Sequence, residues 1–334
     1  MNLKARTMNL HFKLCIPIEH RPRGGMYTFL RLFRRYLAEH NVLVTDEIAD
    51  DYGILFANSF MVDYKSILQA KRRLPKLMIV QRVDGSARDY GRYDDADHWQ
   101  ARVNLLADLT IFQSCYSKYS AREKYKVIAQ DGPVIYNPVD IQIFRPDGSR
   151  LPLEGEIRVC NASFSTNVKK GTWQIGNLAK ANSDVDFILC GQYPQLPDLP
   201  NIHLLGHLSH EELSAAMRSC HVSLHLAEND PCPNVVLEAL ASGLPVLYRD
   251  SGGTPELVGD CGRPVTVDTF REQLETVLAQ RGELSQAARA RAVTHFAPEL
   301  IFPKYLAAMG KAKQNRMPLI LRWCWAVMQG YQVV

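Results

Sequence analysis

The sequence lacks any apolar run long enough to cross a membrane. A transmembrane helix needs about 18 or more consecutive apolar residues, and no stretch of the 334-residue chain reaches that length. A signal peptide is not visible either, because the apolar segment Leu10–Ile18 is short and is interrupted by His11 and Lys13. The sequence therefore predicts neither a membrane span nor a secretory signal.

The eight cysteines lack the spacing of a disulfide framework or of a zinc site, because they are scattered singly and form no Cys-x-x-Cys pair. Free cysteines in apolar segments behave as small hydrophobic residues. We therefore expect a reduced, cytoplasmic protein, with the inner face of the membrane as an alternative peripheral location.

The chain also lacks a strong charge of either sign. Its 39 basic and 35 acidic residues give a net charge of +4, which suits an anionic small molecule or an anionic membrane surface but predicts no nucleic-acid partner. Three histidines, His203, His207 and His210, follow one another closely. They fall on a predicted strand, in a loop and at a helix start, so no zinc site is expected.

Strands and helices alternate along the chain, which is typical of parallel α/β sheets. The expected elements of the first half are the strands His11–Ile16, Gly53–Ala57, Lys76–Gln81, Leu109–Gln113 and Val134–Tyr136 and the helices Met26–Glu39, Tyr64–Arg72, Val103–Ala107 and Lys118–Tyr125. Those of the second half are the strands Ile157–Ala162, Asp186–Cys190, Ile202–Leu205, Val222–Leu226 and Val246–Tyr248 and the helices Thr172–Ala181, His210–Ser219 and Val235–Ala241. A polar, turn-rich linker near residues 147–155 separates the halves. We expect domains at 1–148 and 149–299 and a helical tail at 300–334.

The most informative stretch joins the strand Val222–Leu226 to the helix Val235–Ala241 through an acidic, proline-rich turn. Asn234 stands at the start of this helix, and Asn is a strong N-cap. The first backbone N–H groups of a helix have no partner inside it, and the helix dipole favours negative charge at that end. The stretch therefore predicts a phosphate site at Pro233, Asn234 and Val235.

Two carboxylates accompany this anion site. Glu238 lies one turn into the helix, where it can accept hydrogen bonds from hydroxyl groups of a ligand whose phosphates lie at the helix start. Asp230, eight positions earlier, adds a second acid at the end of the strand. A ligand that places phosphate groups at the backbone amides and hydroxyl groups at the carboxylates fits the description of a nucleotide sugar. An ordinary strand–helix–strand unit with an acidic turn is the alternative.

The acid-x7-Glu pair, followed by Ala-Ser-Gly-Leu-Pro-Val and by Ser251–Leu257, resembles the signature of family 4 glycosyltransferases, which are retaining enzymes with the GT-B fold. Asp230 stands where most members carry Glu. The resemblance extends over roughly Phe12–Phe296. It implies two Rossmann-like, doubly wound domains that face a central cleft, with a nucleoside diphosphate sugar as donor and no cofactor.

A basic loop in the second half matches the family's diphosphate contact. Lys170 precedes Gly171 at the position where relatives carry a basic residue. An Arg that is common earlier in that loop is absent, and Ser163 lies near its place. The resemblance implies that Lys170, assisted by Lys169, contacts the donor diphosphate. A solvated pair of lysines is the alternative.

Two loops of the first half complete the predicted cleft. Gly24 and Gly25 precede the first helix and follow residues 21–23, and glycine lets the backbone approach a ligand closely. Arg82 and Asp84 follow a predicted strand at the carboxyl edge, where open α/β sheets bind ligands. By position, the resemblance implies that Asp84 meets an acceptor or donor-sugar hydroxyl, while Arg82 binds a phosphate or orients Asp84. A surface salt bridge between them is the alternative.

Two further segments bear on metal and membrane binding. Asp94-Asp95-Ala96-Asp97 mimics the metal-binding Asp-x-Asp of a different glycosyltransferase fold, but it falls in a polar loop. The resemblance implies no metal, so we expect this segment at the surface. In the tail, Leu300–Met309 and Leu319–Met328 are predicted helices. Family members end in a helix that crosses back onto the first domain; a basic, Trp-bearing helix on a membrane is the alternative.

Together these features predict a retaining, metal-independent glycosyltransferase that moves a hexose to an acceptor, either a glycan or a lipid-linked or cell-surface polysaccharide precursor. The expected catalytic residues are Asp230, Asp84 and Lys170. The resemblance implies that the leaving phosphate accepts the acceptor's proton, so that no protein base is needed. The rival interpretations are an epimerase-like enzyme of the same fold and a sugar-nucleotide-binding protein without transferase activity.

Overall fold

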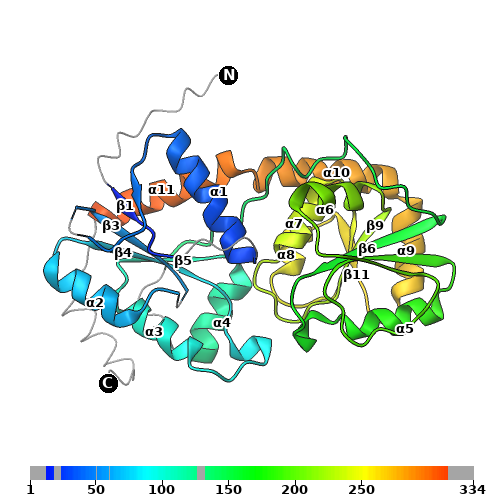
Figure 1. The fold of residues 1–334 in the computed structure, drawn as a ribbon, viewed down its shortest axis with the longest axis horizontal. Coiled ribbons are helices and arrows are strands. Elements are labelled where there is room, and N and C mark those ends of the chain that lie inside the picture. Colours follow the sequence, from blue (N-terminus) through cyan, green and yellow to red (C-terminus); the bar gives the residue numbers. More distant parts are fainter. Residues whose placement is uncertain (1–12, 19–23, 50, 60, 126–131, 315–334) are drawn as a thin grey trace.

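The computed structural model describes residues 13–18, 24–49, 51–59, 61–125 and 132–314. These residues form two α/β domains that lie side by side (Figure 1). The first contains a five-stranded sheet with strand order β2-β1-β3-β4-β5, and the second a six-stranded sheet with order β11-β10-β9-β6-β7-β8. Neighbouring strands in both sheets are parallel. The predicted two-domain GT-B architecture is confirmed.

The first domain buries short apolar strands between two layers of helices. Its strands are β1 (Leu14–Cys15), β2 (Val44–Thr45), β3 (Ile54–Asn58), β4 (Met78–Val83) and β5 (Leu109–Phe112). Its helices are α1 (Gly25–Glu39), α2 (Tyr64–Arg73), the 3-10 turn η1 (Arg88–Tyr90), α3 (Ala96–Leu106) and α4 (Cys115–Tyr125). Every residue of β3, β4 and β5 is buried, as expected for a parallel sheet covered on both faces.

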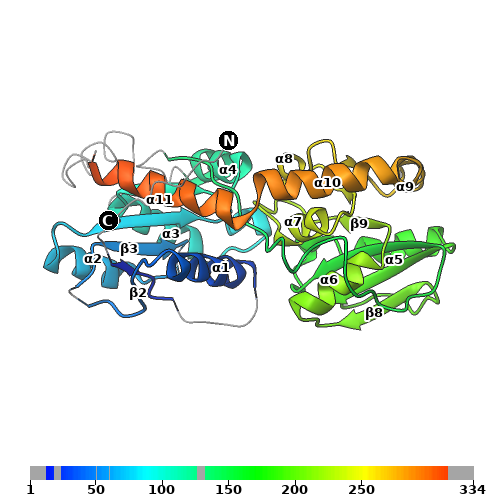
Figure 2. The same ribbon diagram turned by 90° about the horizontal axis from the view of Figure 1, so that it is seen from above.

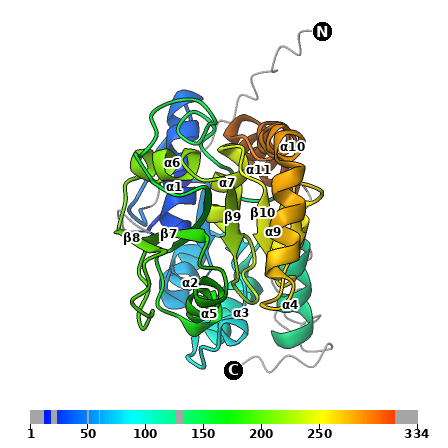
Figure 3. The same cartoon turned by 90° about the vertical axis from the view of Figure 1, so that its right-hand side faces the viewer.

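The second domain repeats the plan around its own sheet (Figure 3). Its strands are β6 (Ile157–Ser163), β7 (Val185–Gly191), β8 (Ile202–Gly206), β9 (Val222–His225), β10 (Val246–Tyr248) and β11 (Gly262–Pro264). Its helices are η2 (Val168–Lys170), α5 (Trp173–Ala181), α6 (His210–Arg218), α7 (Asn234–Ala241), α8 (Thr254–Val258), α9 (Phe270–Ala279) and α10 (Arg281–His295). In Figure 3, α6 and α7 lie on one side of the sheet and α5 on the other.

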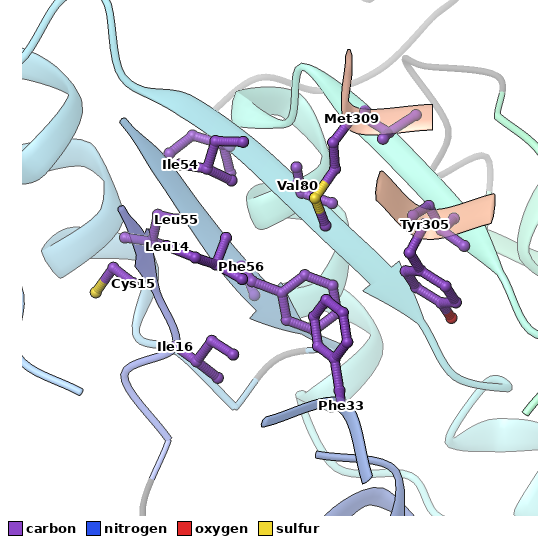
Figure 4. Close-up of a cluster of buried hydrophobic side chains, with 14 of the residues drawn as sticks. Leu14, Cys15, Ile16, Phe33, Ile54, Leu55, Phe56, Val80, Tyr305 and Met309 are labelled. Carbon is purple, nitrogen blue, oxygen red and sulfur yellow. The ribbon is translucent and has the colours of Figure 1, made fainter. Parts of the chain in front are cut away.

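The chain returns to the first domain through its last described helix, α11 (Pro298–Gln314). Figure 2 shows α10 on the second domain and α11 on the first, with a bend between them. Side chains of α11, among them Tyr305 and Met309, pack with Phe33 and Phe56 in the core of the first domain (Figure 4). The predicted helix Leu319–Met328 and the basic residues around it lie outside the described residues.

Phe302 of α11 is fully buried, and its ring centroid lies 5.0 Å from that of Phe33. We expect Phe302→Ala to lower the free energy of unfolding by about 3–5 kcal/mol, because the change removes apolar contacts and leaves a cavity. Chemical denaturation followed by circular dichroism measures this cost. The matched control is Leu300→Ala, since Leu300 is 41% exposed on the same helix and should change stability by less than about 0.5 kcal/mol. Equal costs for the two variants would contradict the account of α11 as part of the core.

One predicted element of the first domain is wrong, and another starts earlier than predicted. Val134–Tyr136 forms no strand, because only Val134 pairs with the sheet, in an isolated bridge to Phe112. The predicted helix Val103–Ala107 begins earlier, at Ala96, and includes part of the segment that we expected to be a polar loop.

Candidate functional site

A cleft of about 910 Å³ separates the two domains. Loops at the carboxyl ends of strands from both sheets line it, which is where open α/β sheets bind ligands. The predicted site residues that line it are Gly24, Gly25, Arg82, Asp84, Ser163, Lys170, Asp230, Pro233, Asn234, Val235 and Glu238. Lys169, which was also a predicted site residue, does not line the cleft.

Lys169 and Lys170 diverge although they are neighbours. Both belong to η2, and successive side chains of such a turn point in different directions. Lys169 Nζ lies 2.5 Å from Glu228 Oε2, and Glu228 Oε1 is 2.9 Å from Arg249 Nη1. The expectation that Lys169 contacts the diphosphate is therefore not supported, because Glu228 holds its ammonium group away from the cleft.

Lys170 instead turns toward the cleft and pairs with Asp230. Its Nζ is 2.6 Å from Asp230 Oδ2, and Asp230 is only 6% exposed. Burial raises the pKa of Asp230, but Lys170 and the nearby His225 outweigh this effect and leave the pKa below its usual value. Asp230 is therefore ionised at neutral pH, and it holds the cation that we expect at the diphosphate.

The helix that follows the acidic turn begins differently from the prediction. Pro233, rather than Asn234, occupies the N-cap position of α7, and no side chain caps that end. The Asn234 side chain is used elsewhere: its Nδ2 donates to Gly25 O at 3.1 Å, and its Oδ1 accepts from Asn137 Nδ2 at 2.8 Å. The predicted N-cap is wrong because Asn234 bridges the two domains. The first turn of α7 nevertheless faces the cleft without a capping side chain, as an anion site requires.

Glu238 is 5% exposed and lines the cleft. Burial raises its pKa to about 7, although Arg31 of α1 has the opposite effect. Within the described part of the chain, its carboxylate forms no hydrogen bond or ion pair, in contrast to that of Asp230. A buried acid without such partners is costly, and a raised pKa of this kind is common at functional sites.

Arg82 and Asp84 form a buried pair at the first domain's side of the cleft. Arg82 is 1% exposed, its guanidinium carbon lies 4.0 Å from the centre of the Phe29 ring, and its Nη1 donates to Asp84 Oδ1 at 2.9 Å and to Asn58 Oδ1 at 2.6 Å. Its Nη2 donates to Asn137. The alternative of a surface salt bridge is therefore wrong, and the geometry fits an arginine that orients Asp84 better than one that binds phosphate.

Asp84 is the more accessible member of this pair, with 34% of its side chain exposed. Burial raises its pKa, while Arg82 and the side chain of Gln113 act against that effect. The acid therefore faces the cleft from a fixed position.

Gly24 and Gly25 begin α1 beside the start of α7. Gly24 has φ of +111°, a conformation that side chains disfavour. A Cβ on Gly25 would lie 3.4 Å from the Asn234 side chain. Residues 21–23 of the same predicted loop lie outside the described residues.

The segment Asp94–Asp97 is only partly at the surface. Asp94 is exposed and pairs with Arg92, but Asp97 is 6% exposed and accepts hydrogen bonds from the backbone of Ala87 at 2.8 Å and of Arg88 at 3.2 Å. The prediction of a surface loop is wrong for Asp97, because the helix starts at Ala96 and turns this carboxylate inward. Across the residues that the structure describes, no three His, Cys, Asp or Glu side chains are grouped to hold a metal ion.

Four residues at or beside the cleft were not predicted: Arg31, Tyr90, His225 and Glu256. Arg31 of α1 reaches the second domain, where its Nη2 lies 3.0 Å from His210 Nδ1. The Glu256 carboxylate accepts hydrogen bonds from Cys115 N at 2.9 Å and Tyr116 N at 2.7 Å, at the start of α4. These contacts join residues more than a hundred positions apart, so no local sequence pattern predicts them.

Comparisons with known proteins find similar sequences and a matching family model. The model of the group 1 glycosyl transferases matches residues 158–280, which lie in the second domain. A GDP-mannose-dependent alpha-mannosyltransferase of Mycobacterium tuberculosis is 29% identical over 252 residues, which are 66% of this chain and 63% of that protein. A protein of the same description from Mycolicibacterium smegmatis is 32% identical over 122 residues, 34% of this chain and 32% of that protein. The chain thus spans about one third of the length of one of these relatives and less than two thirds of the other.

Solved structures resemble the whole architecture. HepE of Anabaena, in complex with UDP-glucose, has a TM-score of 0.69 at 17% identity, covering 90% of this chain and all of that one. WaaG, a glycosyltransferase of lipopolysaccharide biosynthesis, has a TM-score of 0.61 at 14% identity, covering 86% of this chain and 97% of that one. At such identities the likeness shows the fold alone. None of the described helices combines the length and apolar character needed to cross a bilayer.

Proposed function

We propose that the chain is a group 1 glycosyltransferase, the family whose model matches its second domain, and that it moves a sugar from a nucleoside diphosphate sugar to an acceptor hydroxyl with retention of anomeric configuration. The observation that carries this proposal is the grouping of an uncapped helix start, a lysine and two buried acids on one wall of the cleft. Phosphate, sugar and ribose each have a complementary group there.

GDP-mannose is the first donor to consider. Two relatives are described as GDP-mannose-dependent alpha-mannosyltransferases, although the structurally similar HepE is described in complex with UDP-glucose. The acceptor is proposed by class only: a hydroxyl of a glycan or of a lipid-linked or cell-surface polysaccharide precursor.

In the proposed reaction, the first-turn amides of α7 and the Lys170 ammonium group bind the donor diphosphate. Negative charge grows on this group as the glycosidic bond breaks, so fixed donors and a cation stabilise the transition state more than the ground state. Glu238 accepts hydrogen bonds from the ribose hydroxyls, and Asp230 faces the transferred sugar. To do so, Asp230 must exchange part of its contact with Lys170 for the donor.

Asp84 supplies a carboxylate from the opposite wall, where it meets a hydroxyl of the acceptor or of the donor sugar. The acceptor attacks the anomeric carbon from the face that the phosphate leaves, and the departing phosphate oxygen takes the acceptor's proton. The protein's contribution is then orientation and electrostatics.

Titration calorimetry with GDP, UDP and dTDP, each with and without its sugar, tests the binding part of this proposal. We expect one base to bind at least about tenfold more tightly than the others, because specific contacts worth about 1.4 kcal/mol change affinity tenfold. Donor turnover with a panel of acceptors then separates a transferase from an epimerase-like enzyme, which consumes donor without acceptor, and from a binding protein, which consumes none. Failure of all three nucleotides to bind would contradict the proposal.

We also expect activity to persist in a chelator. Amides and Lys170 take the place that a divalent metal occupies in other enzymes that act on diphosphates, and the described residues group no metal-binding side chains at the cleft. The measurement is the initial rate of transfer in EDTA against the rate with added Mg²⁺ or Mn²⁺, and the two rates should agree within about twofold. Loss of activity in EDTA with recovery on adding metal would direct attention back to the acids near Asp94.

A further inference from the structure

The signature segment Ser251–Leu257 lies outside the lining of the cleft and packs against the turn that carries Asp230. Gly253 N donates a hydrogen bond to Asp230 O at 2.8 Å. Gly252 has φ of +67°, and a Cβ at this position would lie 2.4 Å from Asp230 O, so the close approach requires glycine. The segment is therefore attached to the backbone of the loop that presents Asp230.

The same segment reaches the first domain through Glu256. Its Oε2 accepts a hydrogen bond from Cys115 N at 2.9 Å, and its Oε1 accepts one from Tyr116 N at 2.7 Å. The first amides of a helix have no acceptor inside the helix, and the helix dipole favours a carboxylate beside them. Tyr136 Oη, from the connection between the domains, also donates to Glu256 Oε2 at 3.0 Å. Glu256 thus caps α4, a helix of the opposite domain, with both of its oxygens.

The start of α4 that Glu256 caps also holds Asp84. Gln113 Nε2 donates to Asp84 Oδ1, and Ser117 Oγ donates to Asp84 O at 3.1 Å. Ser117 N in turn donates to Ser114 Oγ at 2.9 Å. The side chains of Gln113, Ser114 and Ser117 are all buried. The carboxylate and the backbone of Asp84 are therefore both bound to the first turn of α4.

We propose that Glu256 is a positioning residue that sets the place of Asp84 relative to Asp230. The segment that carries Glu256 is bound to the Asp230 turn at one end and, through the first turn of α4, to Asp84 at the other. It thereby fixes the distance between the two acids across the cleft, where the transferred sugar is proposed to lie. The proposal rests on the functions proposed above for these two acids.

Glu256→Gln tests this proposal, because the amide keeps the size of the side chain but leaves one oxygen to accept where two accept now. We expect kcat to fall about tenfold, the usual effect of losing a hydrogen bond to a charged group, while the affinity for the free nucleoside diphosphate changes less than about twofold. The affinity should persist because the groups proposed to bind the nucleotide lie on α7 and η2. Glu272→Gln is the matched control and should match the wild type, since Glu272 is an exposed acid in the first turn of α9 and does not line the cleft.

The Asp84→Asn background separates positioning from a general structural role. If Glu256 acts through Asp84, Glu256→Gln should lower kcat by less than about twofold once that carboxylate is replaced, because residues that act as a unit have non-additive effects. A fall of about tenfold in both backgrounds would overturn the proposal. Wild-type kcat for Glu256→Gln alone would overturn it too, as would a loss of nucleotide affinity that accompanies the fall in kcat.

Hydrogen exchange followed by mass spectrometry needs no activity, so its result can be told from failure of the proposed function. In Glu256→Gln, exchange should become at least about threefold faster in two separate peptides, one spanning residues 113–118 and one spanning residues 83–87, because loss of the cap loosens the turn that holds the Asp84 loop. Faster exchange in the first peptide alone would overturn the proposal, since it would show a cap with only local effect. Unchanged exchange in both peptides would overturn it as well.

Ser117→Ala is an independent variant in case Glu256→Gln does not fold. It keeps the cap on α4 and removes the hydroxyl group that binds Asp84 O. We expect kcat to fall about threefold to tenfold, the range for a neutral hydrogen bond, with unchanged nucleotide affinity and with faster exchange in the peptide 83–87. A Ser117→Ala protein that matches the wild type in both kcat and exchange would show that α4 does not hold Asp84, and the proposal would be wrong.

Discussion

Replacing Asp230 by Asn should lower the turnover number by about two to three orders of magnitude, the range found when a group that stabilises transition-state charge is removed. Only contacts that strengthen as the sugar becomes cationic accelerate the step, and the ionised, buried carboxylate of Asp230 can provide such a contact. Affinity for the free nucleoside diphosphate should stay the same or increase, because the change releases the Lys170 ammonium group that Asp230 now holds at 2.6 Å. Single-turnover kinetics and calorimetry measure the two quantities separately.

Asp230→Glu is the informative control for this variant. It keeps the charge and restores the length that most members of the family carry, so it should retain far more activity than Asp230→Asn. If Asp230→Asn proves as active as the wild type, the acid serves only to shape the turn, and the proposed contact with the sugar is wrong.

Glu238→Gln should weaken nucleotide binding more than it lowers turnover, which is the opposite of the effect expected for Asp230→Asn. The ribose that Glu238 is proposed to hold does not react, so the variant should bind the cognate nucleotide more weakly by about 1.5–3 kcal/mol, the worth of a hydrogen bond to a charged group, while turnover at saturating donor changes little. Nucleotide affinity measured by calorimetry that equals the wild-type value would rule out the ribose assignment.

The same variant should be more stable than the wild type at alkaline pH. The pKa of Glu238 is about 7 in the folded protein, against 4.5 for a glutamate in water. The folded state therefore disfavours ionisation, and this cost is absent below about pH 4.5, grows as the pH rises, and is complete above about pH 7. Gln carries no charge, so Glu238→Gln should raise the free energy of unfolding by about 3 kcal/mol near pH 8 and by less than about 1 kcal/mol at about pH 5.

Thermal unfolding of the two proteins at both pH values tests this prediction without a substrate. A matched control is Glu212→Gln on α6, because Glu212 is exposed and caps its own helix through Ser209. Losing that capping carboxylate should destabilise the protein slightly at the alkaline pH instead of stabilising it. A wild type that is as stable as Glu238→Gln under alkaline conditions would show that a partner of the Glu238 carboxylate compensates for its burial.

Much of the architecture could be predicted because the strands of parallel α/β domains are short apolar runs in the sequence, separated by amphipathic helices. The strands β3, β6 and β9 start and end within two residues of their predicted bounds. Val134–Tyr136 was mistaken for a strand for the same reason: the segment is apolar because Ile135 is buried and its two neighbours are half-buried near the junction of the domains, where Tyr136 Oη donates to Glu256 at 3.0 Å. Hydrophobicity reports burial and does not distinguish a strand from a buried connection.

The positions of the candidate site residues were predictable where one local element carries them. Asp230 and Glu238 share a strand–turn–helix unit whose geometry follows from its own sequence. The N-cap prediction failed because the Asn234 side chain responds to Asn137 and Gly25, which belong to the other domain. Lys169 does not line the cleft for a related reason, since its ammonium group pairs with Glu228, which belongs to a different loop. Local propensity describes the conformation and contacts that a residue prefers within its own segment. At Asn234 and Lys169, contacts with residues distant in the sequence determine where the side chain lies.

Transfer of isotope-labelled mannose from GDP-mannose to a panel of glycan and lipid-linked acceptors tests the central claim most directly, with UDP-glucose as the second donor and mass spectrometry of the product as the readout. The account predicts a labelled product whose glycosidic bond has the same anomeric configuration as the donor, formed at least about a hundredfold more slowly by Asp230→Asn. Donor consumed at the same rate with and without acceptor, or a product of inverted configuration, would contradict it.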